Sequence, residues 1–550
     1  MTRPPLPGRP PVDPASSEAG RLLCAGTYLD RAFRDRVIEE LYVHSERIVA
    51  PSYGFDASRV LAHALRARRV ELGWAALVLT LWTLAQLLLE PVVLLLLPCL
   101  GLTLTDRLMR RTAGRGVWHV LARLLHNGAR VLLAGTVLFV ALPGPVARST
   151  WLPPVAPAGV AGLGAVGILA LIGYAAEMRH MHVARILGSE LTPQRYAAMA
   201  FETTGHGNNG TRFPRVRARI RREQHQAMIL YNVTNPMCGA GRPFRAWSLS
   251  GLELRPRTDL PASGRPTPLD NTRVLGSITE GLEGLRVPGP KGSPQVEAAV
   301  LDRLRELVIE ECVFLPAQGL PHRDAAPYEP QAMAQHCRDA IEEAGERRRH
   351  YLRIRVSAWD EGMVLTVFVR VHTHGGMLMV EFAPHVLLPV RTLFQSADAI
   401  AARYRAESVL RRVLRSLARA PHSVGDALIL LVQAQGSTWR LATETSDGPY
   451  QMIGPEASVR ELGSEQQASI FHEMDIERFL KAIQERVVGG VSKALHEAGW
   501  QTEEFERQTI RVEPGAVFIQ SVNNSSFGIG GTSHNSTTNH HGDRGTGHGA

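Results

Sequence analysis

A block of strongly apolar sequence, from Leu72 to Ala176, constrains this chain more than any other feature. A basic loop, Asp106 to Arg130, divides the block into two runs, while the mean hydropathy of the whole chain stays near zero. Concentrated apolar runs of this length are typical of membrane-spanning helices. The block therefore predicts where the chain lies, although it does not predict a reaction.

The first run, Leu72 to Thr105, contains Glu90 and Pro91 near its middle. It can form one helix that places Glu90 deep in a bilayer, or two short helices that meet in a turn at this pair. Arginines flank the run on both sides, and basic flanks face the cytoplasm, so an even number of crossings is expected. We therefore expect two hairpins in a transmembrane region 71–177. The four short transmembrane helices cover about 72–89, 91–105, 129–144 and 157–176, with both termini cytoplasmic at a bacterial inner membrane.

Two features of the apolar block have both a functional and a structural interpretation. Glu90 is either a proton or ion site within the membrane or part of a turn at the outer interface, and we favour the turn. The small residues Ala158, Gly162 and Ala165 allow close helix packing, either between copies of the chain or within one bundle. The two runs contain no second acidic residue, which gives a transporter little support.

The charge balance favours a lipid partner over a nucleic acid. The net charge is +9, and the basic residues are 58 arginines and 3 lysines, a bias that indicates a genome rich in G and C. Much of the excess flanks the apolar runs, where anionic lipid headgroups are the natural partner. The five dispersed cysteines form no CxxC pair, so we expect neither a disulfide framework nor a structural zinc, and no cofactor.

Outside the apolar block, the sequence predicts a mixed α+β cytoplasmic part. We expect helices near 294–311, 396–420, 424–434 and 476–496, the last with an apolar stripe closed by Gly499. The expected organisation is a disordered N-terminus (1–25), a helical segment (26–70), a β-rich segment (178–255), a linker (256–293), the α+β domain (294–500) and a low-complexity tail (501–550).

Four arginines alternate with small or apolar residues in the segment RFPRVRARIRRE. They are Arg215, Arg217, Arg219 and Arg221. Period-two alternation predicts that they share one face of a strand. The face is either an anion or lipid-headgroup contact close to the membrane or a solvated strand face, and no aromatic residues interleave for stacking on bases.

Residues 350–388 predict an antiparallel meander of three strands, with turns at Trp359–Gly362 and Gly375-Gly376. Both turns give one continuous apolar face, and Arg370 falls opposite Glu381. His372 and His374 lie on the other face, opposite Met379 and Met377. With Glu381 these two histidines are weak metal candidates, because an HxH pair on a strand can chelate a metal ion. The alternative is a solvated face.

A strand, an Asn-Pro turn and a Gly-Ala-Gly loop follow the arginine segment. The loop can cradle an anion, but no phosphate-binding motif accompanies it, and a structural turn is the interpretation we favour. Its residues are Tyr231, Asn235-Pro236, Gly239, Gly241 and Trp247-Ser248. Together with RRHYLRIRVSAWDEGMVLTVFVRV and the last helix and tail, this segment resembles uncharacterised multi-pass membrane proteins of actinomycetes with a large cytoplasmic domain. The resemblance implies a shared architecture over residues 200–535 and no activity.

The tail carries the segment VFIQSV, which has high β-propensity and no charge, followed by a polar Asn/Ser/Gly stretch. It is either a self-assembly motif or a frayed, disordered end. We expect a membrane-anchored scaffold or signalling protein that self-associates through its transmembrane helices or tail. The alternatives are an enzyme at the inner membrane face acting on an anionic or lipid substrate, and a transporter component.

Overall fold

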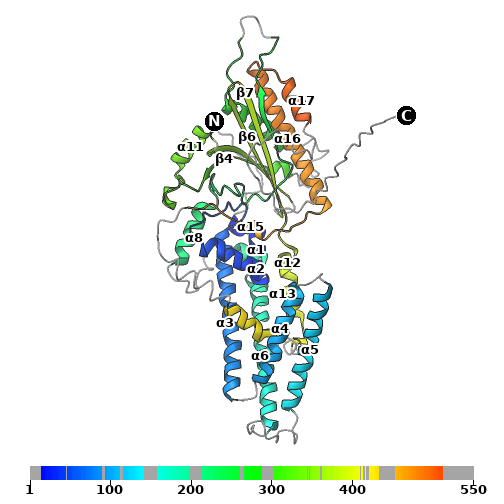
Figure 1. The fold of residues 1–550 in the computed structure, drawn as a ribbon. Coiled ribbons are helices and arrows are strands. Elements are labelled where there is room, and N and C mark those ends of the chain that lie inside the picture. Colours follow the sequence, from blue (N-terminus) through cyan, green and yellow to red (C-terminus); the bar gives the residue numbers. More distant parts are fainter. Residues whose placement is uncertain are drawn as a thin grey trace, which may run out of the picture.

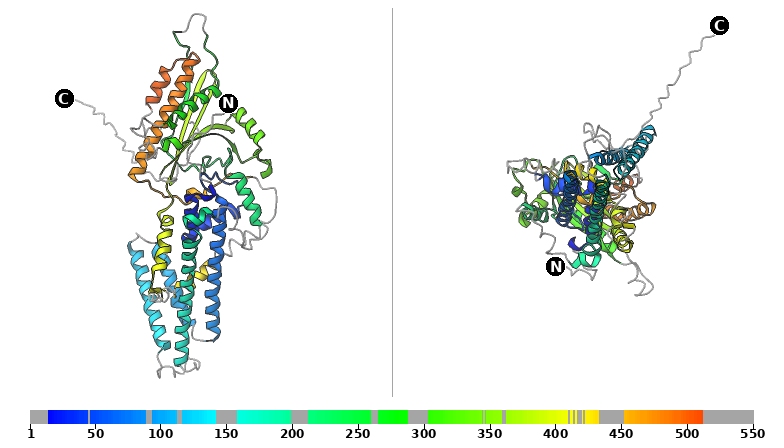
Figure 2. Two further views of the ribbon diagram at one scale, coloured as in Figure 1. Left: turned by 180° about the vertical axis from the view of Figure 1, so that it is seen from behind. Right: turned by 90° about the horizontal axis from the view of Figure 1, so that it is seen from below.

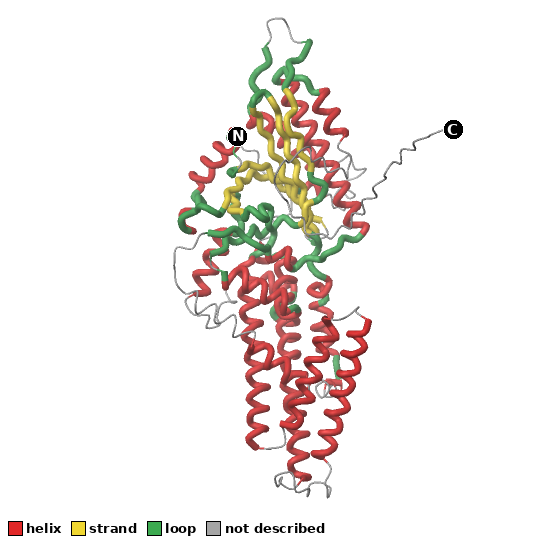
Figure 3. Tube along the Cα trace, in the orientation of Figure 1, coloured by secondary structure: helices red, strands yellow, loops and turns green. Residues whose placement is uncertain are grey.

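The computed structural model shows an elongated molecule with a sheet-containing head at one end and an arm of helices at the other (Figure 1). Figure 3 separates the two by colour, with the strands confined to the head. The structure describes residues 14–44, 46–88, 93–111, 116–141, 158–198, 212–259, 265–287, 303–343, 345, 347–358, 362–408, 411–412, 415, 420, 422–432 and 452–511.

Four long helices build the arm. They are α3 (Ala57–Leu88), α4 (Val93–Arg111), α5 (Gly116–Ala141) and α6 (Ala158–Ser189). Helix α3 leaves the head, because its first turns lie in the core at the base of the head, and α6 returns there through Ile186 and Leu187. Between α3 and α6, helix α4 therefore runs toward the head and α5 runs away from it, so that successive helices are antiparallel.

The expectation of four transmembrane helices is wrong. In the described parts of the chain, no helix combines the length and the apolar character needed to cross a membrane. The helices are present, but α5 begins at Gly116 and includes Arg123 and Arg130. Part of the apolar sequence also packs within the arm, where Val78 and Ile172 share a cluster with residues of the 422–432 helix.

The base of the head is a helical layer between the arm and the sheet. It contains α1 (Glu18–Leu29), α2 (Arg31–Ile38), a π-helical turn (Glu39–Val43), α7 (Pro193–Ala198), α8 (Arg212–Glu223), α12 (Thr392–Gln395), α13 (Ala397–Ala406) and α15 (Val459–Leu462). These elements enclose one cluster around Phe55, Phe394 and Tyr196, each at most 1% exposed. Within the expected helical segment 26–70, the chain forms several helices and not one.

The head is built on a seven-stranded sheet in the order β1-β4-β5-β6-β7-β2, with β3 also pairing with β7. Strand β1 is parallel to β4, and the other pairs are antiparallel. The strands are β1 (Met228–Tyr231), β2 (Arg242–Pro243), β3 (Trp247–Glu253), β4 (Val308–Pro316), β5 (Arg349–Ala358), β6 (Met363–His374) and β7 (Met377–Leu387).

The predicted meander is confirmed in its strands and its register. Strand β6 pairs Arg370 with Glu381 of β7, and β5 pairs Ile354 with Val367 of β6. The turn between β6 and β7 is Gly375-Gly376, both at positive φ. The predicted apolar face is buried throughout: Leu352, Ile354, Val356, Leu365, Val367, Val369, Val371, Leu378, Val380 and Phe382.

Helices α9 (Asn271–Glu283), α16 (Ile470–Glu497) and α17 (Glu503–Arg511) cover this apolar face, and α16 and α17 are the orange helices of Figure 2. Helix α11 (Pro330–Glu342) adds Ile341 to the same cluster. Helix α16 confirms the predicted stripe, with seven buried members: Ile476, Phe479, Leu480, Ile483, Val487, Val491 and Leu495. Gly499 follows it at φ 84°, the left-handed conformation that commonly ends a helix.

The arginine segment is a helix and not a strand. Phe213, Val216 and Ile220 are spaced three and four apart and are all buried, so they form the buried face of α8. The alternation of arginines coincided with this helical pattern and concealed it. Ala218, which a strand would have placed on the apolar face, is exposed.

Other boundaries also differ from the sequence expectation. Helix α9 lies inside the segment expected to be a linker, α1 begins inside the expected disordered N-terminus, and α17 lies inside the expected low-complexity tail. Strand β4 occupies the end of the expected 294–311 helix, and α13 ends at Ala406. Glu90 and the VFIQSV segment of the tail lie outside the described residues, as do residues 288–302.

Candidate functional site

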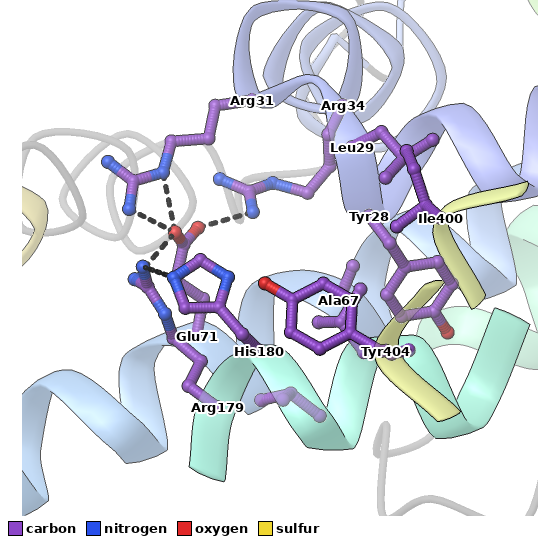
Figure 4. A pocket seen from close by; sticks show the side chains of 13 residues that line it. Tyr28, Leu29, Arg31, Arg34, Ala67, Glu71, Arg179, His180, Ile400 and Tyr404 are labelled. Carbon is purple, nitrogen blue, oxygen red and sulfur yellow. Dashed lines mark hydrogen bonds and ion pairs between the residues drawn. The ribbon is translucent and has the colours of Figure 1, made fainter. Parts of the chain in front are cut away.

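A pocket of about 280 Å³ lies where the arm joins the base (Figure 4). This volume is close to the lower end of the range of small-molecule pockets. Five helices contribute to its wall, and their positions span most of the chain. The lining residues are Tyr28, Leu29, Arg31, Arg34, Ala67, Val70, Glu71, Arg179, His180, Val183, Ala184, Ile400 and Tyr404.

The start of α2 places two arginines on the pocket wall. The side chain of Asp30 caps this helix by accepting hydrogen bonds from the backbone N–H groups of Ala32 and Phe33, at 2.9 and 3.3 Å. Aspartate is among the preferred residues at this position because it satisfies N–H groups that have no partner within the helix. Arg31 and Arg34, three residues apart, then lie on one face of α2.

Three guanidinium groups converge on the carboxylate of Glu71 in α3 (Figure 4). Arg31 and Arg34 form ion pairs with it, and Nη1 of Arg179 in α6 lies 3.6 Å from its Oε1. The side chain of Arg34 is only 5% exposed, while those of Arg31 and Arg179 are 39% and 25% exposed. Arg34 therefore anchors the cluster, and the other two arginines can reach a ligand.

The cluster keeps a positive charge when its acids are ionised. Burial alone would raise the pKa of Glu71, but Arg34 and Arg31 outweigh it, so the pKa is lowered and the carboxylate stays charged. Burial alone would lower the pKa of Arg34, but Glu71 and Asp35 outweigh it and raise the pKa. Three guanidinium groups thus face one carboxylate in the pocket, with Asp35 as a second, more exposed partner of Arg34.

Aromatic side chains form the other wall. The rings of His180 and Tyr404 stack with centroids 6.5 Å apart and planes 10° apart, and Tyr28 lies nearby (Figure 4). Burial raises the pKa of Tyr28, whose hydroxyl is 3.2 Å from Nδ1 of His63. Tyr28 is therefore a neutral hydroxyl. The pocket can hold an anionic group against the arginines and a flat or apolar group against the rings.

Helix α8 holds the four arginines that the sequence analysis assigned to an anion contact, and it separates them. Arg215 and Arg221 are exposed, and Arg221 lies 3.6 Å from Asp56. Arg219 points inward and donates to the carbonyl oxygen of Leu41 at 2.9 Å. Burial, helped by Arg323, lowers the pKa of Arg219 to about 10. Arg217 is half-buried.

The metal candidates lie on the sheet in the predicted register. His372 pairs with Met379, and His374 pairs with Met377. Glu381 accepts hydrogen bonds from Arg370 at 3.3 Å and from the hydroxyl of Tyr351 at 3.0 Å. Within the residues that the structure describes, no three His, Cys, Asp or Glu side chains are placed to hold a metal ion together.

The Gly-Ala-Gly loop does cradle an anion, and this anion belongs to the chain itself. The N–H groups of Gly239 and Gly241 donate to Oε1 of Glu461 at 2.8 and 2.9 Å. Burial raises the pKa of Glu461, and the backbone donors only partly oppose this effect. A Cβ at Gly241 would lie 2.2 Å from the carbonyl oxygen of Val386, so only glycine fits there. The cradle joins the sheet to α15.

The sequence analysis missed the pocket because its residues come from five separate segments. A partial signal was present, since Glu71 directly precedes the apolar block and Arg179 follows three residues after it. Charged residues at both ends of such a block meet when the outermost helices are antiparallel. Neither Arg31 nor Tyr404 carries a local signal of this kind.

The fold and the pocket define an α+β head joined to a helical arm, with an arginine-lined pocket at the junction. The family model of the AbeC-like domain matches residues 246–534, and the chain belongs to this family. The match covers β3 to β7 with α9, α11, α12, α13, α15, α16 and α17, and the four long helices of the arm precede it. No curated protein and no solved structure matches the chain. The resemblance to actinomycete membrane proteins stays a prediction.

Proposed function

We propose that the protein is a membrane-associated scaffold or signalling protein, whose arm contacts lipid through exposed apolar side chains and whose head carries the partner-binding surfaces. The observation that carries the proposal is the outer face of α5. Val117 and Val131 are 82% and 72% exposed, and Leu124 is 64% exposed. Contact between the arm and lipid requires only an exposed apolar face, not a helix that crosses the membrane.

The exposed apolar side chains concentrate on the arm. They include Leu77, Leu84, Leu87, Leu104, Val117, Trp118, Val120, Leu121, Leu124, Leu125, Val131, Leu132, Leu171 and Tyr174. A concentration of exposed apolar side chains in one part of a molecule is typical of a protein or membrane contact. Isolated exposed apolar residues, by contrast, are normal on any protein.

The head-proximal end of the arm favours lipid over a protein partner. Trp118 at the start of α5 and Tyr174 midway along α6 are both 59% exposed. Tyr174 precedes by five residues Arg179 of the same helix, which gathers with Arg31 around Glu71. Apolar side chains followed by a belt of aromatic and basic ones are typical of a surface that meets lipid tails and then anionic headgroups.

Flotation of the full chain with phosphatidylcholine vesicles tests this proposal. The variant Val120→Glu/Leu124→Glu puts two charges one helical turn apart on the exposed face of α5. Because each buried apolar side chain contributes about 1.5–3 kcal/mol, we expect the bound fraction to fall at least tenfold. Flotation equal to that of the unchanged chain would contradict the proposal.

A matched control lies on α16, where Ile470 and Met474 are also four residues apart and are 75% and 61% exposed. The variant Ile470→Glu/Met474→Glu makes the same chemical change on the head. We expect it to float like the unchanged chain. An equal loss in both variants would show that the arm has no special role in binding.

A further inference from the structure

We infer that the junction pocket binds a phosphate-bearing ligand, with the phosphate held by Arg31 and Arg179 and its attached group against His180 and Tyr404. The source of the phosphate is a lipid headgroup or a soluble phosphate compound. This inference goes beyond the scaffold proposal and does not depend on contact between α5 and lipid.

The charge and number of donors favour phosphate over a second carboxylate. Guanidinium groups bind both anions through paired hydrogen bonds. The carboxylate of Glu71 has two oxygens and already receives three arginines. A phosphate monoester offers three oxygens and a charge of about −1.5 to −2 at neutral pH, so it can accept from two guanidinium groups at once and binds each more strongly than a carboxylate does.

The burial of the arginines gives them different roles. Arg34 is nearly inaccessible and is also paired with Asp35, 3.0 Å from its Nε, so it stays with Glu71. Arg31 and Arg179 are more exposed and line the open space of about 280 Å³. They can turn toward a ligand while Arg34 keeps Glu71 in place.

The stacked rings define the rest of the ligand. His180 and Tyr404 present flat surfaces to the space beside the arginines, and Ile400 and Val183 add apolar wall (Figure 4). A bare phosphate ion would leave the aromatic and apolar side chains of this wall exposed to water. The pocket therefore fits a phosphate that carries a small apolar or aromatic group.

Calorimetric titration of the full chain with phenyl phosphate tests the pocket directly, with phenol as the uncharged comparison. We expect phenyl phosphate to bind and phenol to bind at least tenfold more weakly. Arg31→Gln and Arg179→Gln should each weaken binding at least tenfold. The control is Arg255→Gln, since the side chain of Arg255 is 69% exposed and pairs with Glu253 far from the pocket.

A second variant separates a binding role from a structural one. Glu71→Gln removes the internal carboxylate that competes for the arginines. We expect phenyl phosphate to bind several-fold more tightly to this variant, and to raise its melting temperature more than that of the unchanged chain. A purely structural cluster would give a less stable protein with no gain in affinity.

Vesicles distinguish the two sources of phosphate. Phosphatidic acid in phosphatidylcholine is compared with phosphatidylcholine alone, for the unchanged chain and for Arg31→Gln. An Arg31-dependent gain with phosphatidic acid identifies a lipid headgroup, and binding of phenyl phosphate alone identifies a soluble ligand. The inference is overturned if neither phosphate binds better than its neutral counterpart, or if the arginine variants bind like the unchanged chain. Failure of α5 to bind neutral vesicles would leave the phenyl phosphate result unaffected.

Discussion

The head and the arm use apolar residues in opposite ways. In the meander every second residue faces the core, and Val367 and Val380 are fully buried. In α5 apolar residues occur around the helix, and Val117 and Val131 remain mostly exposed. A strand has two faces, so alternation decides which residues lie against the helices that cover the sheet, even in β6, where Met363 to Val371 are buried on both faces. An apolar helix leaves this decision to whatever packs around it. The content of apolar residues alone thus does not determine burial.

The strongest test of the head is the removal of a ring from its core. Phe382 is fully buried, and its ring stacks on Trp247 with centroids 5.2 Å apart. We expect Phe382→Ala to lower the free energy of unfolding by about 3–5 kcal/mol, because a cavity remains where the ring was. Urea unfolding followed by near-ultraviolet circular dichroism measures the loss. A loss below about 1 kcal/mol would mean that the sheet face is loosely packed.

The connection between the sheet and the base is tested at Glu461. Glu461→Ala leaves the N–H groups of Gly239 and Gly241 without their acceptor, and we expect a loss of about 2 kcal/mol in the free energy of unfolding. Glu461→Gln keeps an acceptor oxygen and should cost less. Glu503→Ala, at an exposed position of α17, serves as the control. Equal costs for Ala and Gln would show that the cradle depends on the charge of Glu461 and not on an acceptor.

The base should respond to acid through His63. Burial, with help from Arg59 and Arg66, lowers the pKa of His63 from 6.5 to about 3. The unfolded chain therefore binds a proton below about pH 6.5 that the folded chain does not bind until about pH 3. The contribution of neutral His63 to the free energy of unfolding is fully present above pH 6.5. It is lost as the pH falls from 6.5 toward 3, by at most about 1.4 kcal/mol per pH unit.

Urea unfolding at pH 4, 5, 6 and 7 measures this slope. We expect His63→Gln to flatten it, whereas the same change at the exposed His374 leaves it as it is. A slope that persists unchanged in His63→Gln would assign the acid sensitivity to another group. The carboxylate of Glu71, whose pKa is lowered from 4.5, adds a loss of stability that begins only below about pH 4.5, so it affects the pH 4 measurement alone.

The smallest effect on stability is expected on the arm. Leu124→Ala and Val131→Ala shorten side chains that are 64% and 72% exposed. We expect each to change the free energy of unfolding by less than about 0.5 kcal/mol. The same variants should reduce vesicle flotation several-fold. A large loss of stability in the free protein would show instead that this face of α5 is packed against protein.

In the elements that the sequence predicted correctly, the apolar residues recur with a period that only one secondary structure satisfies. The meander alternates with period two across three strands, and its two turns keep one register. The stripe of α16 has seven members at helical spacing. In α8 both periods were present at once, and the helical spacing of Phe213, Val216 and Ile220 decided the outcome.

The rest depends on contacts between distant segments. The apolar block predicted helices in the correct places, but local pattern does not determine what their sides contact. The pocket joins Arg31, Glu71, Arg179 and Tyr404, and the Gly-Ala-Gly cradle is filled by Glu461 from more than two hundred residues away. Such pairings follow from the packing of whole helices, which no window of sequence contains.

The parallel pairing of β1 with β4 has a practical consequence for dissecting the molecule. The family match begins at residue 246, after β1 and β2, so a fragment limited to the match would lack both strands. The edge of β4 that pairs with β1, from Val313 to Pro316, would then have no neighbouring strand. Open strand edges recruit other chains and promote aggregation. A recombinant fragment for crystallisation or antibody production should therefore begin upstream of Met228.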